Sequence, residues 1–586
     1  MNKQGIHGKR KGATVPSVKP APAPGKPLSG LNLLLPTAVL FITFLAFLPS
    51  LQNGLLKTWD DQAYITHNDL ITSLSPGNII RIFREDKGLY ANYHPLTTLS
   101  LAVNHSISGD SPFGYHLTNL FLHLLNTLLV FLFIYLLTGK KVVPAAIVSL
   151  LFGIHPMHVE SVAWISERKD VLYTLFFLAS LISWQIYLKR KNDPQFYLLS
   201  LFLFACSLLS KAMAAPLPLV LFLIDYISVR KLNVRIFLEK IPFLLFSIGF
   251  GILAIHIQAS SNATSSDLFS LSGRILHACY GFTIYILKLI IPFRLSAFYP
   301  YPYPLVNSAW VLNHTPSVFY FTLFISLAIL VLVALLMVKP GATYRMVAFS
   351  LLFYSATIVL VLQFIPVGRA IMADRYVYLA AIGIFILPGL LADHFYRKKR
   401  YRVPVMVCLI VYCGTLAFMT FQRCKVWKND ETLWTDVIEK YPGDNRIILP
   451  IANRANYFYI ENRMPEALKD YLLAASMNQN DDVVLEKIGR IYGKEMHNID
   501  SALIYFTRAY EKNTQNLDAI SGLAIVYGIK GDLGKSLQFS LAGLKIKGDD
   551  PPLLYNIGIT YKNLGEKEKG EEFLQRAFRL DPSLKH

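Results

Sequence analysis

The sequence has few charged residues and few cysteines for its length. Only 16% of its 586 residues are charged, whereas soluble globular proteins usually carry about a quarter. The five cysteines lie in or beside apolar segments without metal-ligand spacing, which argues against a zinc site or a disulfide framework. Acidic residues number 38 against 57 basic ones, giving a net charge of +19. The basic residues are scattered through short loops rather than gathered into one patch, so we expect no nucleic-acid partner.

Long apolar runs fill residues 31–422, and many are close to the roughly 20 residues that a membrane-spanning helix needs. We expect eleven spans, near residues 31–50, 116–138, 142–163, 170–188, 195–210, 212–228, 241–257, 317–338, 346–365, 376–393 and 403–422. A further apolar stretch, 275–293, is predicted to be re-entrant or interfacial, because the loop charges on either side place both of its ends on one side of the membrane.

The basic loops predict the orientation of these spans. Residues 1–30 carry six Lys or Arg, five Pro and no acid, which is typical of a disordered basic tail. This tail and the loops around Lys140, Arg190, Arg230 and Arg345 fall on one side, which we expect to be cytoplasmic. The sequence thus predicts an integral protein of a bacterial cytoplasmic (inner) membrane with a periplasmic C-terminus. An endoplasmic-reticulum membrane with a lumenal C-terminus is the alternative.

The C-terminal part of the chain repeats with a period of 34 residues. Aligning the last two units superposes Gly558 on Ala524 and Tyr561 on Tyr527. Small residues where two helices cross, followed by an aromatic three positions later, are typical of tetratricopeptide repeats. Such helix pairs stack into a curved solenoid, which can serve as a peptide-binding groove or as a rigid spacer.

The sequence therefore predicts an all-α chain in four parts. A disordered basic tail (1–30) precedes a membrane domain (31–422) with a large outer loop at 52–115. A connecting helix (423–447) then leads to about four tetratricopeptide repeats (448–586).

Two adjacent acids, Asp60 and Asp61, follow the first apolar run between Trp59 and Tyr64. A single carboxylate at a membrane edge can simply be solvated, but two in tandem beside aromatic residues favour a functional role. Neighbouring side chains point in different directions, so one carboxylate can face a reacting group while the other orients it or binds a cation. The same long loop holds His94, which precedes a proline, and loops of this length are usually functional or disordered.

A second polar cluster lies at the predicted outer end of the third span, in the segment GIHPMHVESVAWISERKD. It offers His155, His158, Glu160, Glu167, Arg168 and Asp170. The two histidines with a nearby glutamate could ligate a metal, so a divalent cation stays open, although the spacing is no specific zinc signature. Ionisable residues at a bilayer edge more often line a polar cavity.

Several cations on the predicted outer side oppose the tendency of positive charge to stay inside. They include Lys211, in a tight turn between spans, and Arg375, in the segment PVGRAIMADRYVYLA. A bound anion such as a lipid phosphate would account for them, and arginine suits phosphate because its planar fork offers several donors. Generic contact with lipid headgroups is the alternative.

Several motifs together resemble a known family. They are TWDDQAYITHN, YHPLTTLSLAVNH, YHLTNLFLHLLN, FGIHPMHVESVAWISERKDVL and ADRYVYLAAIG. With the repeats, they resemble the transmembrane and tetratricopeptide-repeat-containing O-mannosyltransferases and their bacterial relatives, of the GT-C superfamily. The resemblance covers residues from about 31 to the C-terminus, and the HPxHxE and DD blocks are its most specific parts.

The resemblance implies an inverting glycosyltransferase that depends on a polyprenyl-phosphate sugar. It implies a catalytic acid in the first outer loop, here Asp61 or Asp60, with Asp61 slightly favoured. It also implies that Arg375 contacts the donor phosphate. Two features depart from the family: His94 stands where we expect arginine in the animal members, and the repeat array is short.

We therefore hypothesise a membrane enzyme that moves a sugar, such as mannose, from a polyprenyl-phosphate carrier to a hydroxyl of a protein or glycan held by the repeats. The carboxylate pair would supply the base. Candidate contacts to substrate and phosphate are Arg375, Lys211, Arg168, His94, His155, His158, Glu160 and Asp170. A membrane-anchored repeat scaffold without catalysis and a ligase for lipid-linked glycans are the alternatives. Membrane lipid is an expected partner in each case.

Overall fold

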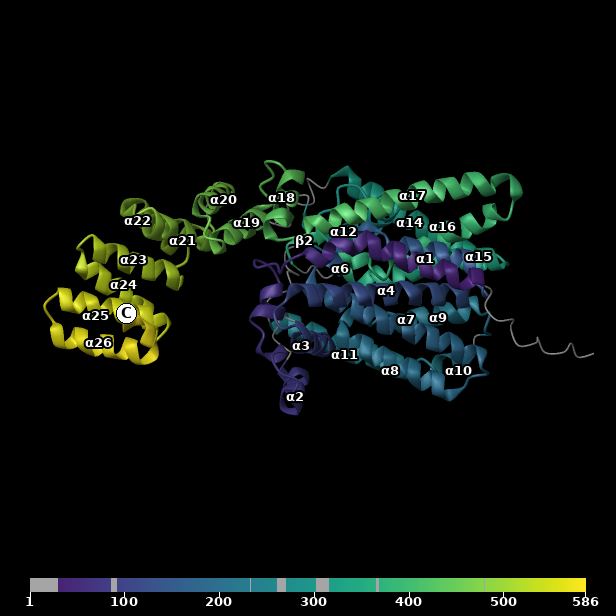
Figure 1. Cartoon of the computed structure of the whole chain (residues 1–586), viewed down its shortest axis with the longest axis horizontal. Coiled ribbons are helices and arrows are strands. Elements are labelled where there is room, and N and C mark those ends of the chain that lie inside the picture. The colour runs from purple at the N-terminus through teal and green to yellow at the C-terminus, as the bar shows by residue number, and fades with distance from the viewer. Residues whose placement is uncertain are drawn as a thin grey trace, which may run out of the picture.

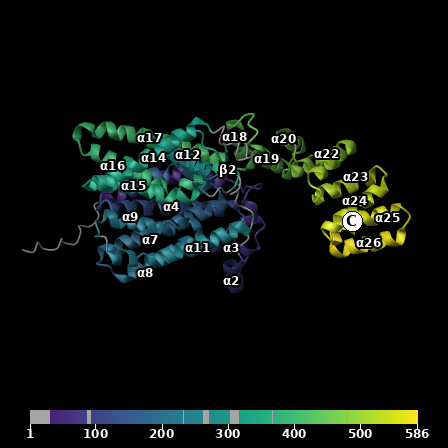
Figure 2. The same ribbon diagram turned by 180° about the vertical axis from the view of Figure 1, so that it is seen from behind.

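The structure, a computed structural model, describes residues 30–85, 92–231, 233–260, 270–301, 316–364, 368–478 and 480–585. Within these residues the chain is all-α apart from one short two-stranded ribbon. Long helices run side by side in a bundle, and an array of shorter helices extends from one end of it (Figure 1). The view from behind shows the same two parts (Figure 2).

The bundle contains apolar helices at all eleven predicted positions. Seven are long and apolar enough to cross a membrane: Leu33–Gln52, Pro112–Leu137, Ile165–Lys189, Val234–Ile257, Ser317–Val338, Ala342–Val361 and Lys399–Val426. An eighth is a bent pair, Val142–Gly153 with Pro156–Ala163, broken by 51°. The other three are shorter apolar helices, Pro194–Ser210, Ala212–Ile227 and Ala381–Tyr396. The chain is thus a polytopic membrane protein, and full crossing by the bent and shorter helices stays a prediction.

The helices of the bundle are labelled as in Figure 1. They are α1 (Gly30–Phe47), α4 (Pro112–Leu137), α5 (Val142–Gly153), α7 (Arg168–Lys189), α8 (Pro194–Ser210), α9 (Leu217–Ile227), α11 (Ile241–Ser260), α14 (Ser317–Val338), α15 (Ala342–Ile358), α16 (Ala381–Tyr396) and α17 (Lys399–Val426). Large apolar side chains at their contacts, such as Phe133, Phe353 and Trp184, are fully buried and form the core.

Helix α12 (Leu271–Ile290) covers the stretch predicted to be re-entrant or interfacial. It packs against α14, where Thr283 Oγ1 donates to the Thr322 carbonyl at 3.2 Å. Its last turn reaches α17, because Tyr412 of that helix donates to the Ile290 carbonyl at 2.8 Å. Helix α12 is not one of the described helices that are long and apolar enough to cross a membrane. Its re-entrant or interfacial character stays a prediction.

The basic loops meet at one end of the bundle. That this end faces the cytoplasm stays a prediction. Lys189 Nζ donates to the Leu136 carbonyl at 3.0 Å, and Lys141 lies 4.0 Å from Asp393. Short helix α10 (Val234–Leu238) lies at this end too, far from α2 and α3 (Figure 1). We call this the basic end.

The opposite end carries the short elements that surround the candidate site. They are η1 (Leu48–Gln52), η2 (Gln62–Thr66), η3 (Asp69–Ile71), α2 (Pro76–Glu85), α3 (Pro95–Ser108), η5 (Pro156–His158), α6 (Val159–Ala163), η6 (Ile165–Glu167), η7 (Ala212–Ala214), β1 (Tyr299–Pro300), η9 (Val359–Val361), β2 (Ala370–Met372) and η10 (Asp374–Val377). The two strands pair antiparallel, with Tyr299 opposite Met372. We call this the site end.

Helix α18 (Asp430–Lys440) joins the bundle to the repeats and holds the loop that carries the two acids. Asp430 accepts hydrogen bonds from the amides of Lys57 and Thr58, at 2.7 and 3.0 Å. The indole of Trp434 donates to the Thr58 hydroxyl at 3.1 Å. The loop at 57–61 is therefore fixed by a helix about 370 residues further along the chain.

Eight helices form four successive pairs at the end of the chain. They are α19 (Ile448–Ile460) and α20 (Met464–Met477), α21 (Asp482–Arg490) and α22 (Ile499–Lys512), α23 (Leu517–Ile529) and α24 (Leu533–Ile546), α25 (Pro551–Asn563) and α26 (Lys567–Leu580), with η11 (Ile491–Glu495) and η12 (Pro582–Lys585). The aligned Tyr527 and Tyr561 each stack on a phenylalanine of the second helix at 5.7 Å. The equivalent turn glycines, Gly531 and Gly565, both have positive φ, at 80° and 90°. The 34-residue period predicted from the sequence thus corresponds to equivalent contacts in successive helix pairs.

Gly558→Ala is expected to destabilise the last helix pair by about 1–3 kcal/mol. A Cβ at this position would lie 2.9 Å from the Gly570 carbonyl oxygen and 2.7 Å from Leu574, so α25 and α26 would have to separate. Hydrogen exchange of the full-length chain measures this, and peptides from 551–580 should exchange faster. Gly548→Ala is the control, because nothing lies within 4 Å of its added methyl group. Equal exchange in the two variants would contradict the close crossing.

Candidate functional site

The two adjacent acids have different environments. Asp61 is 1% exposed, and its two carboxylate oxygens accept hydrogen bonds from the amides of Leu56 and Ser166, each at 3.0 Å. Burial raises the pKa of Asp61 to about 6, although these amides lower it. Asp61 therefore ties the loop to η6, just before α7. The Asp60 side chain is 24% exposed and lies 3.8 Å from the ammonium of Lys169.

A chain of ion pairs runs inward from Asp60. Lys169 also lies 3.2 Å from Glu167, and Glu167 lies 3.3 Å from the guanidinium of Arg375. Burial raises the pKa of Asp60, and the charge of Lys169 acts in the opposite direction. Three contacts shorter than 4 Å thus link a partly open carboxylate to the arginine that the sequence predicts as a phosphate contact.

Lys211 joins the same network from the turn between α8 and η7. Its ammonium lies 2.5 Å from Asp170 and 3.4 Å from Glu167. Ser161 donates a further hydrogen bond to Asp170 at 3.0 Å. Glu167 is therefore shared by three cations, and the structure unites two predicted clusters that lie about 40 residues apart in the sequence.

Arg375 is held by a second carboxylate and by aromatic rings. Its guanidinium donates to Glu160, and its backbone amide lies 3.3 Å from the same carboxylate. The guanidinium also lies 5.4 Å from the centre of the Trp164 ring, which packs on Trp59 at 4.2 Å. The Arg375 side chain remains 19% exposed, so part of the fork can still meet a ligand.

The network is close to charge balance. Four carboxylates, of Asp60, Glu160, Glu167 and Asp170, face three cations, of Lys169, Lys211 and Arg375. When all seven groups are ionised, the sum is one negative charge. Because buried charges are costly unless they are paired, the network holds its members in fixed positions.

His94 lies beside this network at the start of α3. It is 5% exposed and lines a small cavity of about 30 Å³ together with Ala212 and Phe250. Thr97 of the same helix donates to the Ser210 carbonyl, next to Lys211, at 3.0 Å. Burial lowers the pKa of His94 well below its ordinary value, and Lys169 and Lys211 lower it further. Its imidazole is therefore neutral at neutral pH.

His155 and His158 pack into the core of the site end. His155 Nδ1 accepts from the Met157 amide at 3.3 Å, and its Nε2 lies 3.2 Å from the Leu289 carbonyl. His158 Nδ1 lies 2.7 Å from the Phe152 carbonyl. Both rings are fully buried. Within the described residues no group of three or more His, Cys, Asp or Glu side chains is arranged to hold a metal ion.

Arg168 and its neighbour Lys169 have different partners. Its guanidinium donates to the Asn119 side chain, to the Tyr115 carbonyl at 3.0 Å and to Ser100 at 3.4 Å. It is fully buried, and these partners are neutral. Arg168 thus connects α3, α4 and α7. The sequence hypothesis that it helps to bind phosphate has no support in these contacts, and the cation that does face the carboxylates is Lys169.

These features define the class of protein: a polytopic helical membrane protein with a charged site at one end of its bundle and a helical repeat array beside that site. A tetratricopeptide-repeat family model matches residues 551–584. The Caenorhabditis elegans protein O-mannosyl-transferase F38B6.6 is 24% identical over 478 residues, which cover 76% of this chain and 63% of that protein.

Two further relatives carry the same kind of name. Human protein O-mannosyl-transferase TMTC1 is 25% identical over 491 residues, covering 74% of this chain and 54% of the relative. Mouse TMTC1 is 36% identical over 171 residues, covering 26% and 18%. These matches confirm the resemblance to the transmembrane and tetratricopeptide-repeat-containing O-mannosyltransferases. The chain spans 63% of the length of the Caenorhabditis elegans relative and 54% of the length of human TMTC1.

Proposed function

We propose that this chain is a membrane glycosyltransferase. It moves a sugar, such as mannose, from a polyprenyl-phosphate carrier to a hydroxyl group of a protein. The basic end would face the cytoplasm, and the site end and the repeats would face the outer or lumenal side. The observation that carries the proposal is the ion-pair chain from Asp60 to Arg375, which puts a partly open carboxylate and a partly open cation at one end of an apolar bundle.

The acceptor hydroxyl needs a negatively charged base nearby, and the leaving phosphate needs positive charge nearby. The acceptor hydroxyl attacks the anomeric carbon and loses its proton, while the bond from that carbon to the phosphate oxygen breaks. Asp60 would take the proton, as a general base does. Arg375 would stabilise the charge that develops on the phosphate, with Lys169 and Lys211 behind it. A single displacement of this kind inverts the configuration at the anomeric carbon.

Asp60 is better suited than Asp61 to be the base. A base must come within hydrogen-bond reach of the proton that it removes. Asp61 is buried, with each oxygen already accepting from a backbone amide, whereas Asp60 has an open side and no such bonds among the described residues. Burial raises the pKa of both acids, so the choice between them rests on access to the acceptor. Asp61 would instead hold the loop in place.

The position of the repeats supports a protein acceptor. Lys57, three residues before Asp60, lies 2.6 Å from Glu461 at the end of the first repeat helix α19. A peptide held along the repeats would therefore leave them beside the loop that carries the base. Tetratricopeptide arrays commonly present such extended binding surfaces.

The experiment is a transfer assay with the full-length chain in nanodiscs. It receives polyprenyl-phosphate mannose and a peptide with serine and threonine hydroxyls, and intact mass of the peptide is measured. We expect a gain of one hexose per modified hydroxyl. Gain of a whole oligosaccharide when a lipid-linked glycan replaces this donor would favour a ligase instead.

The scaffold alternative makes a different prediction. If the membrane part only anchors the repeats, no sugar is transferred from any polyprenyl-phosphate donor, and residues 423–586 on an unrelated single span replace the full chain in cells. Both results together would overturn the proposal. The charged network would be hard to explain in that case, because buried ion pairs contribute little to stability by themselves.

A further inference from the structure

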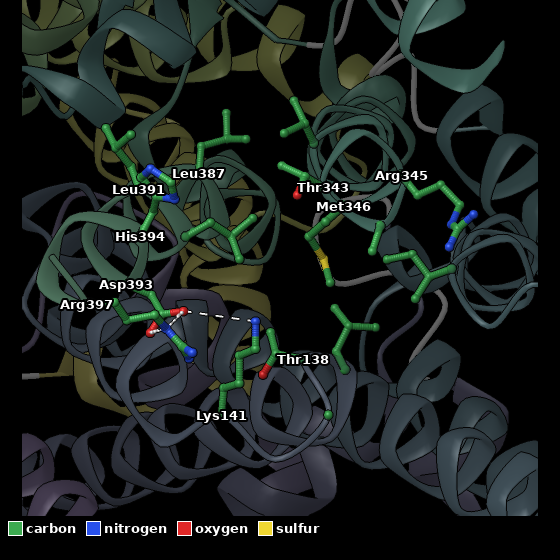
Figure 3. Close-up of a pocket in the computed structure, with 16 residues that line it drawn as sticks. Thr138, Lys141, Thr343, Arg345, Met346, Leu387, Leu391, Asp393, His394 and Arg397 are labelled. Carbon is green, nitrogen blue, oxygen red and sulfur yellow. Dashed lines mark hydrogen bonds and ion pairs between the residues drawn. The ribbon is translucent and has the colours of Figure 1, made fainter. Parts of the chain in front are cut away.

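A cavity lies at the basic end of the bundle, remote from the charged network. It has a volume of about 820 Å³ and is lined where α4 and α16 end and α5 and α15 begin. Figure 3 shows its opening between these helices, with basic side chains on both sides. Ligand-binding cavities of proteins commonly measure about 300–1,000 Å³.

The polar side of this cavity is positively charged. Lys141 and Arg397 lie beside Asp393, at 4.0 and 3.1 Å, and this is the only carboxylate among the described residues that line the cavity. Arg345 lies across the opening from them (Figure 3). Within the described part of the chain, the structure shows no hydrogen bond or ion pair for the Arg345 guanidinium. Three cations thus face one carboxylate.

Arg345 also borders a neighbouring cavity of about 550 Å³, where Arg230 and Lys339 lie. It sits in the first turn of α15, and the residue before that helix, Gly341, provides no side-chain cap. The first amides of α15 therefore add partial positive charge on the same side as Arg345. Both features favour an anion.

The other side of the cavity is apolar and reaches the outer surface of the bundle. Leu387, Leu390 and Leu391 of α16 line it together with Met346 of α15. Leu391 is 59% exposed, on a helix expected to lie in the membrane. A hydrocarbon chain can therefore pass from the cavity along α16 into the surrounding lipid.

We propose that this cavity binds an anionic phospholipid. The phosphate lies among Arg345, Lys141 and Arg397, and an acyl chain follows the leucines of α16. Basic pockets between membrane helices are suited to such headgroups, with each cation near the surface contributing about 5-fold to affinity. The lipid would join α5, α15 and α16 at the end opposite the transfer site, and it is distinct from the sugar donor.

Native mass spectrometry of the full-length chain tests this proposal, with phosphatidylglycerol and phosphatidylcholine of the same acyl chains as probes. We expect phosphatidylglycerol to bind more tightly, and Arg345→Ala to weaken its binding about 5-fold. The matched control is Lys399→Ala, which removes an equal charge from an exposed position at the same end and should leave binding unchanged. The guanidinium of Arg345 makes no hydrogen bond or ion pair with the described residues, so its removal should not disturb folding.

Two further measurements distinguish binding of a phospholipid from binding of a simple anion. Met346→Trp fills the apolar side without changing charge and should weaken phosphatidylglycerol binding as well. Inorganic phosphate should not compete. Equal binding of the two lipids, equal effects of Arg345→Ala and Lys399→Ala, or displacement of the lipid by inorganic phosphate would each overturn the proposal.

Discussion

Asp60→Asn is expected to lower the rate of sugar transfer by about 10²–10⁴-fold, the usual contribution of a general base. Asparagine has nearly the same shape but cannot take the proton of the acceptor. The change removes one negative charge from a network that carries one in excess, so the fold should persist. The measurement is turnover in nanodiscs with radiolabelled polyprenyl-phosphate mannose and an acceptor peptide.

Asp69→Asn is the matched control for this variant. It makes the same chemical change nine residues further along the same loop, at an exposed carboxylate, and should retain full activity. Asp61→Asn should act differently, because an amide nitrogen cannot accept from the Leu56 or Ser166 amide. We expect it to lower thermal stability along with activity. Wild-type turnover in Asp60→Asn would refute the assignment.

The pH profile gives a readout that loss of structure would not produce. The base must be ionised to act, and burial raises the pKa of Asp60 above its ordinary value of 3.8. Wild-type activity should therefore fall as the pH drops through that raised pKa, at a higher pH than an ordinary aspartate would give. In Asp60→Asn the residual activity should lose this acidic limb, whereas Asp69→Asn should keep it.

Much of the fold could be predicted from the sequence, because spans and repeats are local patterns. An apolar run of about 20 residues forms a buried or membrane-spanning helix in most cases. A 34-residue period indicates that successive units fold alike and make equivalent contacts with their neighbours. The chain thus shows apolar helices at all eleven predicted positions and four helix pairs after them. The boundaries shifted by several residues at places such as α17, which begins at Lys399 rather than near 403.

The different environments of Asp60 and Asp61 could not be predicted. They depend on the Ser166 amide, about 100 residues away, and on α18, which fixes the loop from the other end of the chain. Nothing beside the two acids in the sequence encodes these contacts. The slight preference for Asp61 from sequence is therefore replaced by a proposal for Asp60.

The choice between two adjacent cations was also beyond the sequence. Arg168 and Lys169 stand next to each other where η6 gives way to α7, so a small change in helix phase decides which one faces the carboxylates. The structure turns Arg168 to Asn119 and Lys169 to Glu167. A signal was present, since Glu167 and Asp170 flank both residues, but it does not distinguish them.

Arg375→Lys is expected to lower kcat/KM for the lipid-linked donor by about 10²-fold, the loss that removing one transition-state donor usually causes. Lysine keeps the positive charge between Glu160 and Glu167 but loses the planar fork. The KM for the acceptor peptide should stay the same, because the acceptor meets Asp60. Arg369→Lys, an equal change at an exposed position in the same segment, serves as the control.

A purely structural role for Arg375 predicts a different pattern, and a double variant separates the two. Arg375→Ala leaves Glu160 and Glu167 short of a cation, so it should cost about 3–5 kcal/mol of stability. Adding Glu160→Gln removes one of those charges and should recover most of the lost thermal stability. If Arg375 acts on the donor phosphate, the recovered double variant remains as inactive as Arg375→Ala. If transfer returns with stability, the guanidinium only holds the fold, and the phosphate contact must be sought at Lys169 and Lys211.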